Sequence, residues 1–237
     1  MLIIDLKNAG GYFLASFRRH GNPCSRISSA YRAAFSFFYL RAEENCYLAS
    51  TSFREALISL TAEKLKRRKR LILLRHAKSD WPEGMDDHER PLGDRGRKAA
   101  PVMGVYLDKA RLIPDLVLVS TAKRAQETWK RAAKAIKTVV PQQDVHAIYE
   151  AGVDDLLKVI RGVGPDVRTL MIVGHNPGIE NLAKRLMKDQ GGEPGERLRE
   201  KFPTAAIAVV SFDIADWKDI AVETGSLDKF VTPKSVG

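Results

Sequence analysis

Cysteine is scarce in this chain of 237 residues, which contains Cys24 and Cys46 and no cysteine after them. Two cysteines cannot form a disulfide framework or a four-cysteine zinc site, and these two lack the CxxC spacing. The sequence has no run of 18 apolar residues, so it predicts no membrane-spanning helix. It also lacks a GxxxxGK(S/T) loop and a paired-aspartate metal motif, which excludes P-loop enzymes and the obvious metal phosphatases.

Acidic residues are few near the N-terminus, and the net charge of +10 is unevenly distributed. Residues 1–70 contain 13 Lys and Arg against 5 Asp and Glu, whereas residues 71–237 contain 26 against 24. The second region is therefore nearly neutral, which argues against a nucleic-acid-binding domain. These counts divide the sequence into a basic N-terminal extension, residues 1–70, and a domain, residues 71–237.

Three interpretations of the extension stay open. It is a dispensable leader or mis-called start, an organellar targeting segment, or a genuine helical extension. Up to Arg41 it holds one acid, Asp5, among arginines, serines and aromatics. A helix is predicted from Ser52 to Lys66, with Ser52 as its cap. The run KLKRRKR, residues 64–70, predicts a solvated linker.

Short apolar runs alternate with helical patterns from Leu71 onward. This alternation predicts an α/β fold, a three-layer α/β/α sandwich with a mostly parallel central sheet. Strands are expected at residues 71–74, 115–120, 144–149, 169–174, 205–212 and 219–223, and the last two favour an antiparallel edge. Helices are expected at residues 94–110, 122–137, 154–163 and 178–188, and residues 191–195 are expected to form a flexible loop.

The candidate catalytic and ligand-binding residues lie at the ends of the predicted strands. Arg75 and His76 follow the first strand, Arg124 lies shortly after the second, Glu150 follows the third and His175 the fourth. In open parallel sheets, ligands bind at the carboxyl ends of the strands. We therefore expect two histidines, two arginines and one carboxylate to converge on one edge of the sheet.

Such a set of side chains favours phosphoryl transfer. A neutral imidazole is a good nucleophile toward phosphorus when the phosphoryl oxygens are neutralised and held in line. Arg75 and Arg124 offer bidentate donors for those oxygens. His175 adds a third donor, and Gly174 before it is expected to leave room for close approach of the ligand.

Five segments now identify a resemblance. LILLRHAKSDW, HERPLGDRGRKAA, VLVSTAKRAQET, IVGHNPGIE and FPTAAIAVVSFD resemble, in order and spacing, the histidine phosphatase superfamily and within it the SixA-like phosphohistidine phosphatases. The resemblance runs from about Leu71 to Val231. Two positions depart from it: Ala77 stands where many members have Gly, and Gly93 where Thr or Ser is common.

The resemblance implies a phosphoglycerate mutase-like fold, a covalent phosphohistidine on His76, and a phosphate pocket made of Arg75, Arg124 and His175. It implies no metal and no cofactor. Larger relatives that act on sugar phosphates place a lid after the third strand, whereas only about 20 residues separate Glu150 from the fourth strand here. A shallow pocket that admits a protein side chain is therefore expected.

The sequence offers several carboxylates as candidates for the general acid. Glu150 is the favoured candidate, and Asp80, Asp154 and Asp155 are its rivals. A phosphohistidine substrate weakens the need for an acid, because a protonated imidazole leaves readily. Other side chains are expected to have structural rather than catalytic roles: a structural ion pair for Arg90, surface or strand positions for His88 and His146, and packing for Trp129 and Leu186.

The sequence thus predicts a metal-independent phosphatase that acts through a phosphohistidine intermediate. Its expected substrate is phosphohistidine on a protein, and its expected location is the cytoplasm. A small-molecule phosphomonoesterase or mutase of the same superfamily is the first alternative. A non-catalytic phosphate-binding adaptor is the second, from another class. No nucleic-acid partner is expected, and the oligomeric state is left open.

Overall fold

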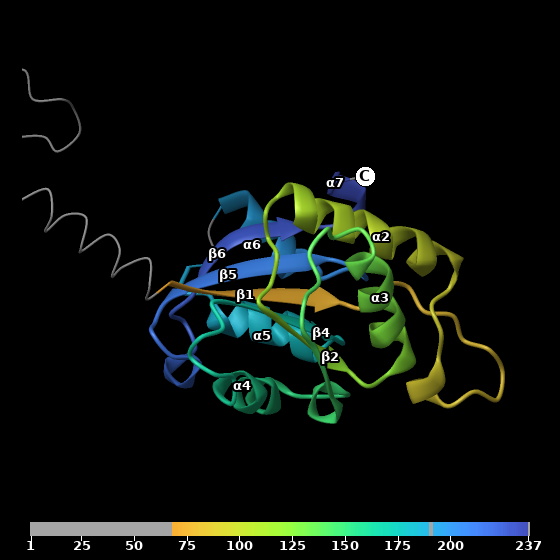
Figure 1. The fold of residues 1–237 in the computed structure, drawn as a ribbon, viewed down its shortest axis with the longest axis horizontal. Helices are drawn as coiled ribbons and strands as arrows, with labels where there is room; N and C mark the ends of the chain where they lie inside the picture. The colour runs from red at the N-terminus through yellow and green to blue at the C-terminus, as the bar shows by residue number, and fades with distance from the viewer. Residues whose placement is uncertain (1–67, 190–191, 237) are drawn as a thin grey trace, which may run out of the picture. The chain divides into compact units, whose positions relative to one another are not determined.

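The structure is a computed structural model that describes residues 68–189 and 192–236 (Figure 1). The predicted helix 52–66 lies outside these residues. The strands are β1 Arg68–Arg75, β2 Leu116–Ser120, β3 Gln142–Val145, β4 Thr169–Gly174, β5 Ile207–Asp213 and β6 Ser226–Val231. The helices are α2 Asp94–Lys109, α3 Lys123–Ala133, α4 Val153–Arg161, α5 Gly178–Leu186, α6 Gly192–Glu200 and α7 Pro233–Val236. Short 3₁₀ helices lie at 87–89, 146–148 and 217–219.

The six strands form one mixed sheet in the order β3-β2-β4-β1-β5-β6. The pairs β3–β2, β2–β4 and β4–β1 are parallel, while β5 is antiparallel to both β1 and β6. Helices cover both faces, and Figure 1 shows α2 and α4 on opposite sides of the sheet. The α/β class and the predominance of parallel pairing are confirmed.

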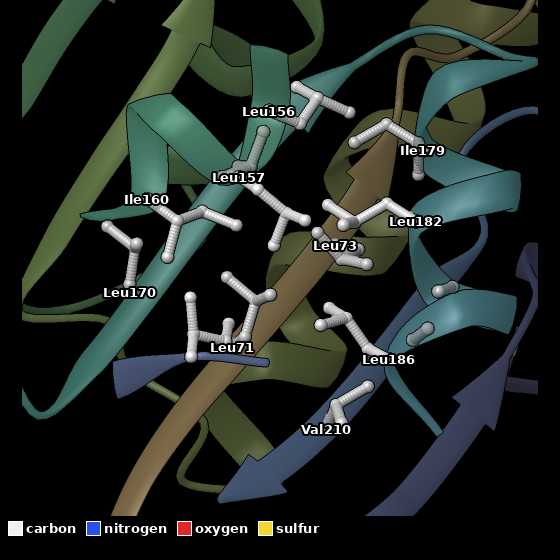
Figure 2. Packing of buried hydrophobic residues seen from close by; sticks show 14 of the residues in the cluster. Leu71, Leu73, Leu156, Leu157, Ile160, Leu170, Ile179, Leu182, Leu186 and Val210 are labelled. Carbon is white, nitrogen blue, oxygen red and sulfur yellow. The ribbon is translucent and has the colours of Figure 1, made fainter. Parts of the chain in front are cut away.

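Alternate residues of β1 serve two separate cores. Leu71 and Leu73 face α4 and α5, where Figure 2 shows them among leucine and isoleucine side chains from both helices. Ile72 and Leu74 face the opposite way, into the core beneath α2 and α3. All four side chains have no exposed surface. A strand buried on both faces is a continuous apolar run, as the sequence LILL is.

The first residues of β1 and α2 are stabilised by local polar interactions. β1 begins at Arg68, three residues before the predicted apolar run, so the prediction of a solvated linker was wrong for Arg68, Lys69 and Arg70. Lys69 is buried and donates hydrogen bonds to the carbonyls of Pro165 and Val167. α2 begins after Gly93, which supplies no side-chain cap, and Asp94 in its first turn complements the helix dipole.

Three further local predictions were wrong. Residues 219–223 form no strand: the second antiparallel strand is β6, and Asp216 instead caps a 3₁₀ turn that buries Trp217. The strand expected at 144–149 ends at Val145, because the next residues turn into a 3₁₀ helix. The expected loop 191–195 contains the start of α6, where Pro194 is tolerated since the first turn needs no backbone donor.

None of the helices in the described ranges is long and apolar enough to cross a membrane.

Close packing of α2 on α3 depends on Gly104. A Cβ atom added there would lie 2.0 Å from the Ala132 carbonyl oxygen of α3. We predict that Gly104→Ala lowers the free energy of unfolding by about 1–3 kcal/mol, because the helices must separate. Helix propensity alone predicts the opposite sign. Urea denaturation measures the change, and Gly164→Ala is the control, because no atom lies within 4 Å of its Cβ position. Equal stability of Gly104→Ala and wild type would contradict this account of the packing.

Candidate active site

The site lies where β1 and β4 end. Their parallel register pairs Arg75 with Gly174, and the His76 backbone N–H continues the pairing by donating to the Gly174 carbonyl at 3.0 Å. The next residue of each strand is a histidine. The ring centroids of His76 and His175 therefore lie 5.0 Å apart.

His76 is held as a neutral imidazole. Its Nδ1 lies 2.8 Å from the Ala77 carbonyl oxygen, which can only accept, so Nδ1 carries the proton and Nε2 keeps its lone pair. Burial lowers the pKa of His76 to about 4. The hydrogen bond to Ala77 opposes this shift, and the charges of Arg124 and Arg75 add to it. A buried neutral imidazole with one free nitrogen is the protonation state of a nucleophile.

His175 is fixed by Ser120, the last residue of β2. Its Nε2 lies 2.8 Å from the Ser120 hydroxyl, whereas its buried Nδ1 has no hydrogen-bond partner among the described residues. Burial lowers the pKa of His175 to about 3, and the neighbouring His76 and Arg124 add to the shift. When the Ser120 hydroxyl donates to Nε2, the proton of the neutral ring sits on Nδ1. That nitrogen is then a buried donor with no partner in the part of the chain that the structure describes.

Arg75 directly precedes His76, and its guanidinium group is held by a hydrogen bond to the segment after α6. Its Nη1 donates to the Phe202 carbonyl at 2.6 Å, and its buried Nε has no partner within the part of the chain described. The backbone N–H of Ala205 donates to the carbonyls of Arg75 and His76, both at 3.1 Å. Ala205 has φ +61, a left-handed conformation that a non-glycine residue adopts at a cost. The segment after α6 thus holds the end of β1 in place.

Arg124 enters from the first turn of α3. Its Nη1 donates to the Asp87 carbonyl oxygen at 2.5 Å and its Nη2 to the Asp87 carboxylate at 2.8 Å. Thr128, one turn further, accepts from the Ala77 N–H at 2.9 Å and donates to the Arg124 carbonyl at 2.6 Å. These bonds fix α3 to the loop that follows His76.

Asp87 is the centre of this network and was missed by sequence reasoning. Besides Arg124, it accepts from Arg90 Nη1 at 2.8 Å and from the Tyr149 hydroxyl at 2.9 Å. Burial raises its pKa, but the bonds from Arg90, Tyr149 and Arg124 outweigh burial and hold the pKa well below its ordinary value. The structural ion pair expected for Arg90 is present. An ion pair for Arg90 requires a carboxylate, and Asp87 lies three residues before it. The sequence therefore contained a signal that could have identified Asp87.

Tyr149 links this network to His175. Its ring meets the His175 ring edge-on at 5.7 Å between centroids and the His88 ring at 4.9 Å. His88, expected as an ordinary surface residue, also lies 3.0 Å through Nε2 from the Thr121 hydroxyl. His146 lies further out, with 6.2 Å between its ring centroid and that of Tyr149. Aromatic rings therefore form one wall of the site.

Glu150 stands apart from the clustered residues. It is exposed, has φ +52, and forms no hydrogen bond or ion pair within the described ranges. Its charge still acts on the neighbouring Tyr149, whose pKa is raised first by burial and then by Asp87 and Glu150. Glu150 is thus next to the wall of the site without touching the histidines.

The rival carboxylates have other partners. The Asp80 side chain accepts from the Trp81 backbone N–H at 3.1 Å. Asp155 pairs with Lys158 at 2.9 Å, and Asp154 lies 3.7 Å from Arg185.

The expectation for Gly174 was wrong. A Cβ atom at this position would lie 3.0 Å from Ile179 and 3.1 Å from Ile148. The missing side chain therefore makes room for core packing rather than for a ligand. Trp129 and Leu186 are buried in the two cores, as predicted.

The site thus brings two arginines close to two neutral histidines, a combination of side chains that is suited to phosphoryl transfer. No group of three or more His, Cys, Asp or Glu within residues 68–189 and 192–236 is arranged to hold a metal ion.

Comparisons with known proteins agree with this class. Residues 71–158 match the model of the histidine phosphatase superfamily, branch 1. An uncharacterised protein of Mycobacterium tuberculosis is 36% identical over 163 residues, which is 68% of this chain and all of that protein. A Nakamurella multipartitia structure assigned as the phosphohistidine phosphatase SixA is 28% identical with a TM-score of 0.62, covering 70% of this chain and 96% of that one. An Agrobacterium tumefaciens structure with the same assignment is 28% identical with a TM-score of 0.59, covering 70% and 98%.

The chain belongs to the histidine phosphatase superfamily, and its fold is the phosphoglycerate mutase-like fold of its SixA neighbours. It is a phosphatase of the SixA-like type.

The network around Asp87 makes a pH-dependent contribution to stability. We predict that Asp87→Asn lowers the free energy of unfolding by about 1–2 kcal/mol at pH 7, less than for a fully buried pair because the carboxylate is 36% exposed. The folded-state pKa lies below the ordinary value of 3.8, so the contribution is fully present above pH 3.8 and is lost as pH falls below it. Urea denaturation at pH 7 and pH 3 measures the difference. Asp86→Asn, an exposed neighbour, is the control, and a constant difference at both pH values would contradict the prediction.

Proposed function

We propose that this enzyme removes phosphate from phosphohistidine on a protein, with His76 as the nucleophile. The observation that carries the proposal is the state of His76: Nδ1 is committed to the Ala77 carbonyl, and the low pKa leaves Nε2 free at neutral pH. The phosphohistidine assignment of the two 28% identical structures supports the substrate class.

In the first step, the lone pair of His76 Nε2 attacks phosphorus. A new N–P bond forms as the P–N bond of the substrate breaks, and the leaving imidazole nitrogen takes a proton. Arg75 and Arg124 neutralise the phosphoryl oxygens, whose charge rises in the transition state, and the neutral His175 donates a hydrogen bond to them from Nδ1. In the second step, water attacks phosphorus, the bond to Nε2 breaks, and phosphate and neutral His76 are released.

Glu150 is our proposed proton donor and acceptor for these steps. Its exposed position beside Tyr149 lets it reach a substrate without occupying the phosphate pocket. An imidazole leaving group needs this help less than an alkoxide does. The acid therefore matters most for ester substrates.

The short connection between Glu150 and β4 favours a protein substrate. It contains α4 and short loops, and α4 buries Leu156, Leu157 and Ile160 in the core. Too little chain remains there for an additional subdomain above the strand ends. A phosphorylated side chain on a protein surface can approach such a site, whereas an enclosed site would select small esters. Activity on small phosphomonoesters is the alternative within the family.

Replacement of His76 tests the nucleophile. We predict that His76→Ala has no measurable turnover of phosphohistidine peptide or p-nitrophenyl phosphate, assayed in EDTA. Radiolabelled substrate should leave an acid-labile, alkali-stable phosphate on the wild type but not on the variant. Full activity of His76→Ala would refute the proposal.

Replacement of Arg124 tests the phosphate pocket. Loss of one preorganised donor typically lowers kcat by about 10²- to 10³-fold. We predict a loss of that order for Arg124→Ala, measured by steady-state kinetics with p-nitrophenyl phosphate. Arg131→Ala, on the same helix but outside the site, is the control. Wild-type kinetics for Arg124→Ala would place the phosphate elsewhere.

Residues before β1 are not needed for catalysis, in our proposal. A truncated protein that begins at Lys66 keeps all of β1 and should retain both kcat/KM and melting temperature. A second truncation that begins at Leu71 loses Lys69 and its two bonds to the carbonyls of Pro165 and Val167, and should melt lower. Scanning calorimetry and the same kinetic assay compare them. Failure of the Lys66 truncation to fold would assign a structural role to the preceding segment.

A further inference from the structure

A groove of about 680 Å³ lies outside the catalytic cluster, between α2, α6 and the C-terminal segment that includes α7. Six cationic side chains and a single carboxylate line it. The cations are Lys78, Arg95, Lys98, Arg197, Lys201 and Lys234, and the carboxylate is Glu200. The domain as a whole is nearly neutral, with 26 Lys and Arg against 24 Asp and Glu in residues 71–237. The groove therefore carries a local excess of cationic side chains.

The cations of the groove are largely uncompensated. Arg197 lies 3.8 Å from Glu193 on its own helix. The other five form no ion pair within residues 68–189 and 192–236. Unpaired cations on one surface repel one another, and an anionic partner removes that cost while gaining the attraction.

The groove shares a wall with the phosphate site. Pro203 and Thr204 line the groove, while the residues on either side of them, Phe202 and Ala205, bond to Arg75 and to the end of β1. Lys78, also in the groove, is two residues from His76. A protein bound along the groove would therefore extend directly to the catalytic residues.

The floor of the groove indicates the kind of anion. Ala99, Val102 and Phe230 contribute apolar surface between the cations. The cations are long side chains from α2, α6, α7 and the segments that follow β1 and α6, and five of them are exposed, so they do not converge on one point as a compact phosphate would require. Binding of single-stranded nucleic acid uses exposed aromatic side chains on which bases stack, whereas Phe230 is 4% exposed. Carboxylates around an apolar stripe match this pattern best.

We propose that the groove docks an acidic, amphipathic segment of the same protein that carries the phosphohistidine. This inference rests on the proposed function and adds the chemistry of partner recognition. A shallow site around one side chain offers little contact area, so a second surface supplies affinity and selects the partner. Charges at the rim of such a surface act mainly on the association rate and its salt dependence.

Two synthetic peptides with one phosphohistidine test the proposal. One carries glutamates and leucines beside the histidine, and the other has glutamine at each glutamate position. The full chain should prefer the glutamate peptide by at least tenfold in kcat/KM at low salt, and the preference should shrink as salt rises. The double variant Lys98→Ala, Lys234→Ala should lose most of it through KM, while its kinetics with p-nitrophenyl phosphate show that the site is intact.

A matched control removes the same charge elsewhere. Lys130→Ala, Lys137→Ala changes two exposed lysines on the α3 side and should keep the preference. If this control lost the preference for the glutamate peptide to the same extent, the docking proposal would be overturned, because the change in net charge would then explain the effect. Equal kcat/KM for both peptides in the wild type would overturn it as well.

Binding of the unphosphorylated glutamate peptide separates this inference from the proposed function. Fluorescence anisotropy should show binding to the wild type and to the α3 control, and a loss of binding in the groove variant. If p-nitrophenyl phosphate is hydrolysed but neither phosphopeptide is, the proposed substrate class fails while the binding result still decides the groove. If tripolyphosphate binds the groove and the peptide does not, the docking proposal is overturned in favour of a small polyanion.

Discussion

The parallel pairing of β1 with β4 aligns Arg75 with Gly174, and the two histidines that follow leave the sheet side by side. A slip of two residues would move one imidazole by about 7 Å along its strand. Apolar patterning alone does not prevent this, because both strands are buried on both faces. Polar groups at the other end of the two strands favour the observed register: the buried Lys69 side chain of β1 donates hydrogen bonds to the carbonyls of Pro165 and Val167, which lie just before β4.

Charge within the site is divided between permanent cations and neutral rings. Arginine side chains are permanent cations. Burial is the main cause that keeps His76 and His175 neutral; Arg124 adds to the lowering of both pKa values, and Arg75 adds to that of His76. If the histidines were protonated, four cations would share the pocket with one carboxylate, Asp87. In the proposed mechanism, this division of charge lets the arginines attract a phosphoryl group while the neutral His76 ring attacks it. Phosphate binding and the neutral state of His76 therefore both involve Arg75 and Arg124 in that mechanism, although burial has the larger effect on the pKa of His76.

Sequence reasoning succeeded where one physical rule determines the outcome. Strands buried on both faces appear as apolar runs, and ligands meet the carboxyl ends of parallel strands, so the positions of His76 and His175 followed directly. β6 was missed because its sequence SLDKFV has mixed burial, and its pairing with β5 is interrupted by an irregularity at Val209 and Val210. Asp87 and Tyr149 were missed because they lie 62 residues apart in sequence, and no local pattern relates them.

The donors around the expected phosphate position differ in how much a ligand gains from them. Buried groups without partners give the most, because binding removes a desolvation cost that the free enzyme already bears. His175 Nδ1 and Arg75 Nε are such groups. Arg124, in contrast, is already bonded to Asp87, so it contributes charge and a fixed orientation rather than a newly satisfied donor. The geometry of the pocket therefore depends on a carboxylate and a tyrosine that are bonded to each other, and the loop carrying Asp87 is as much a part of the site as the strand ends.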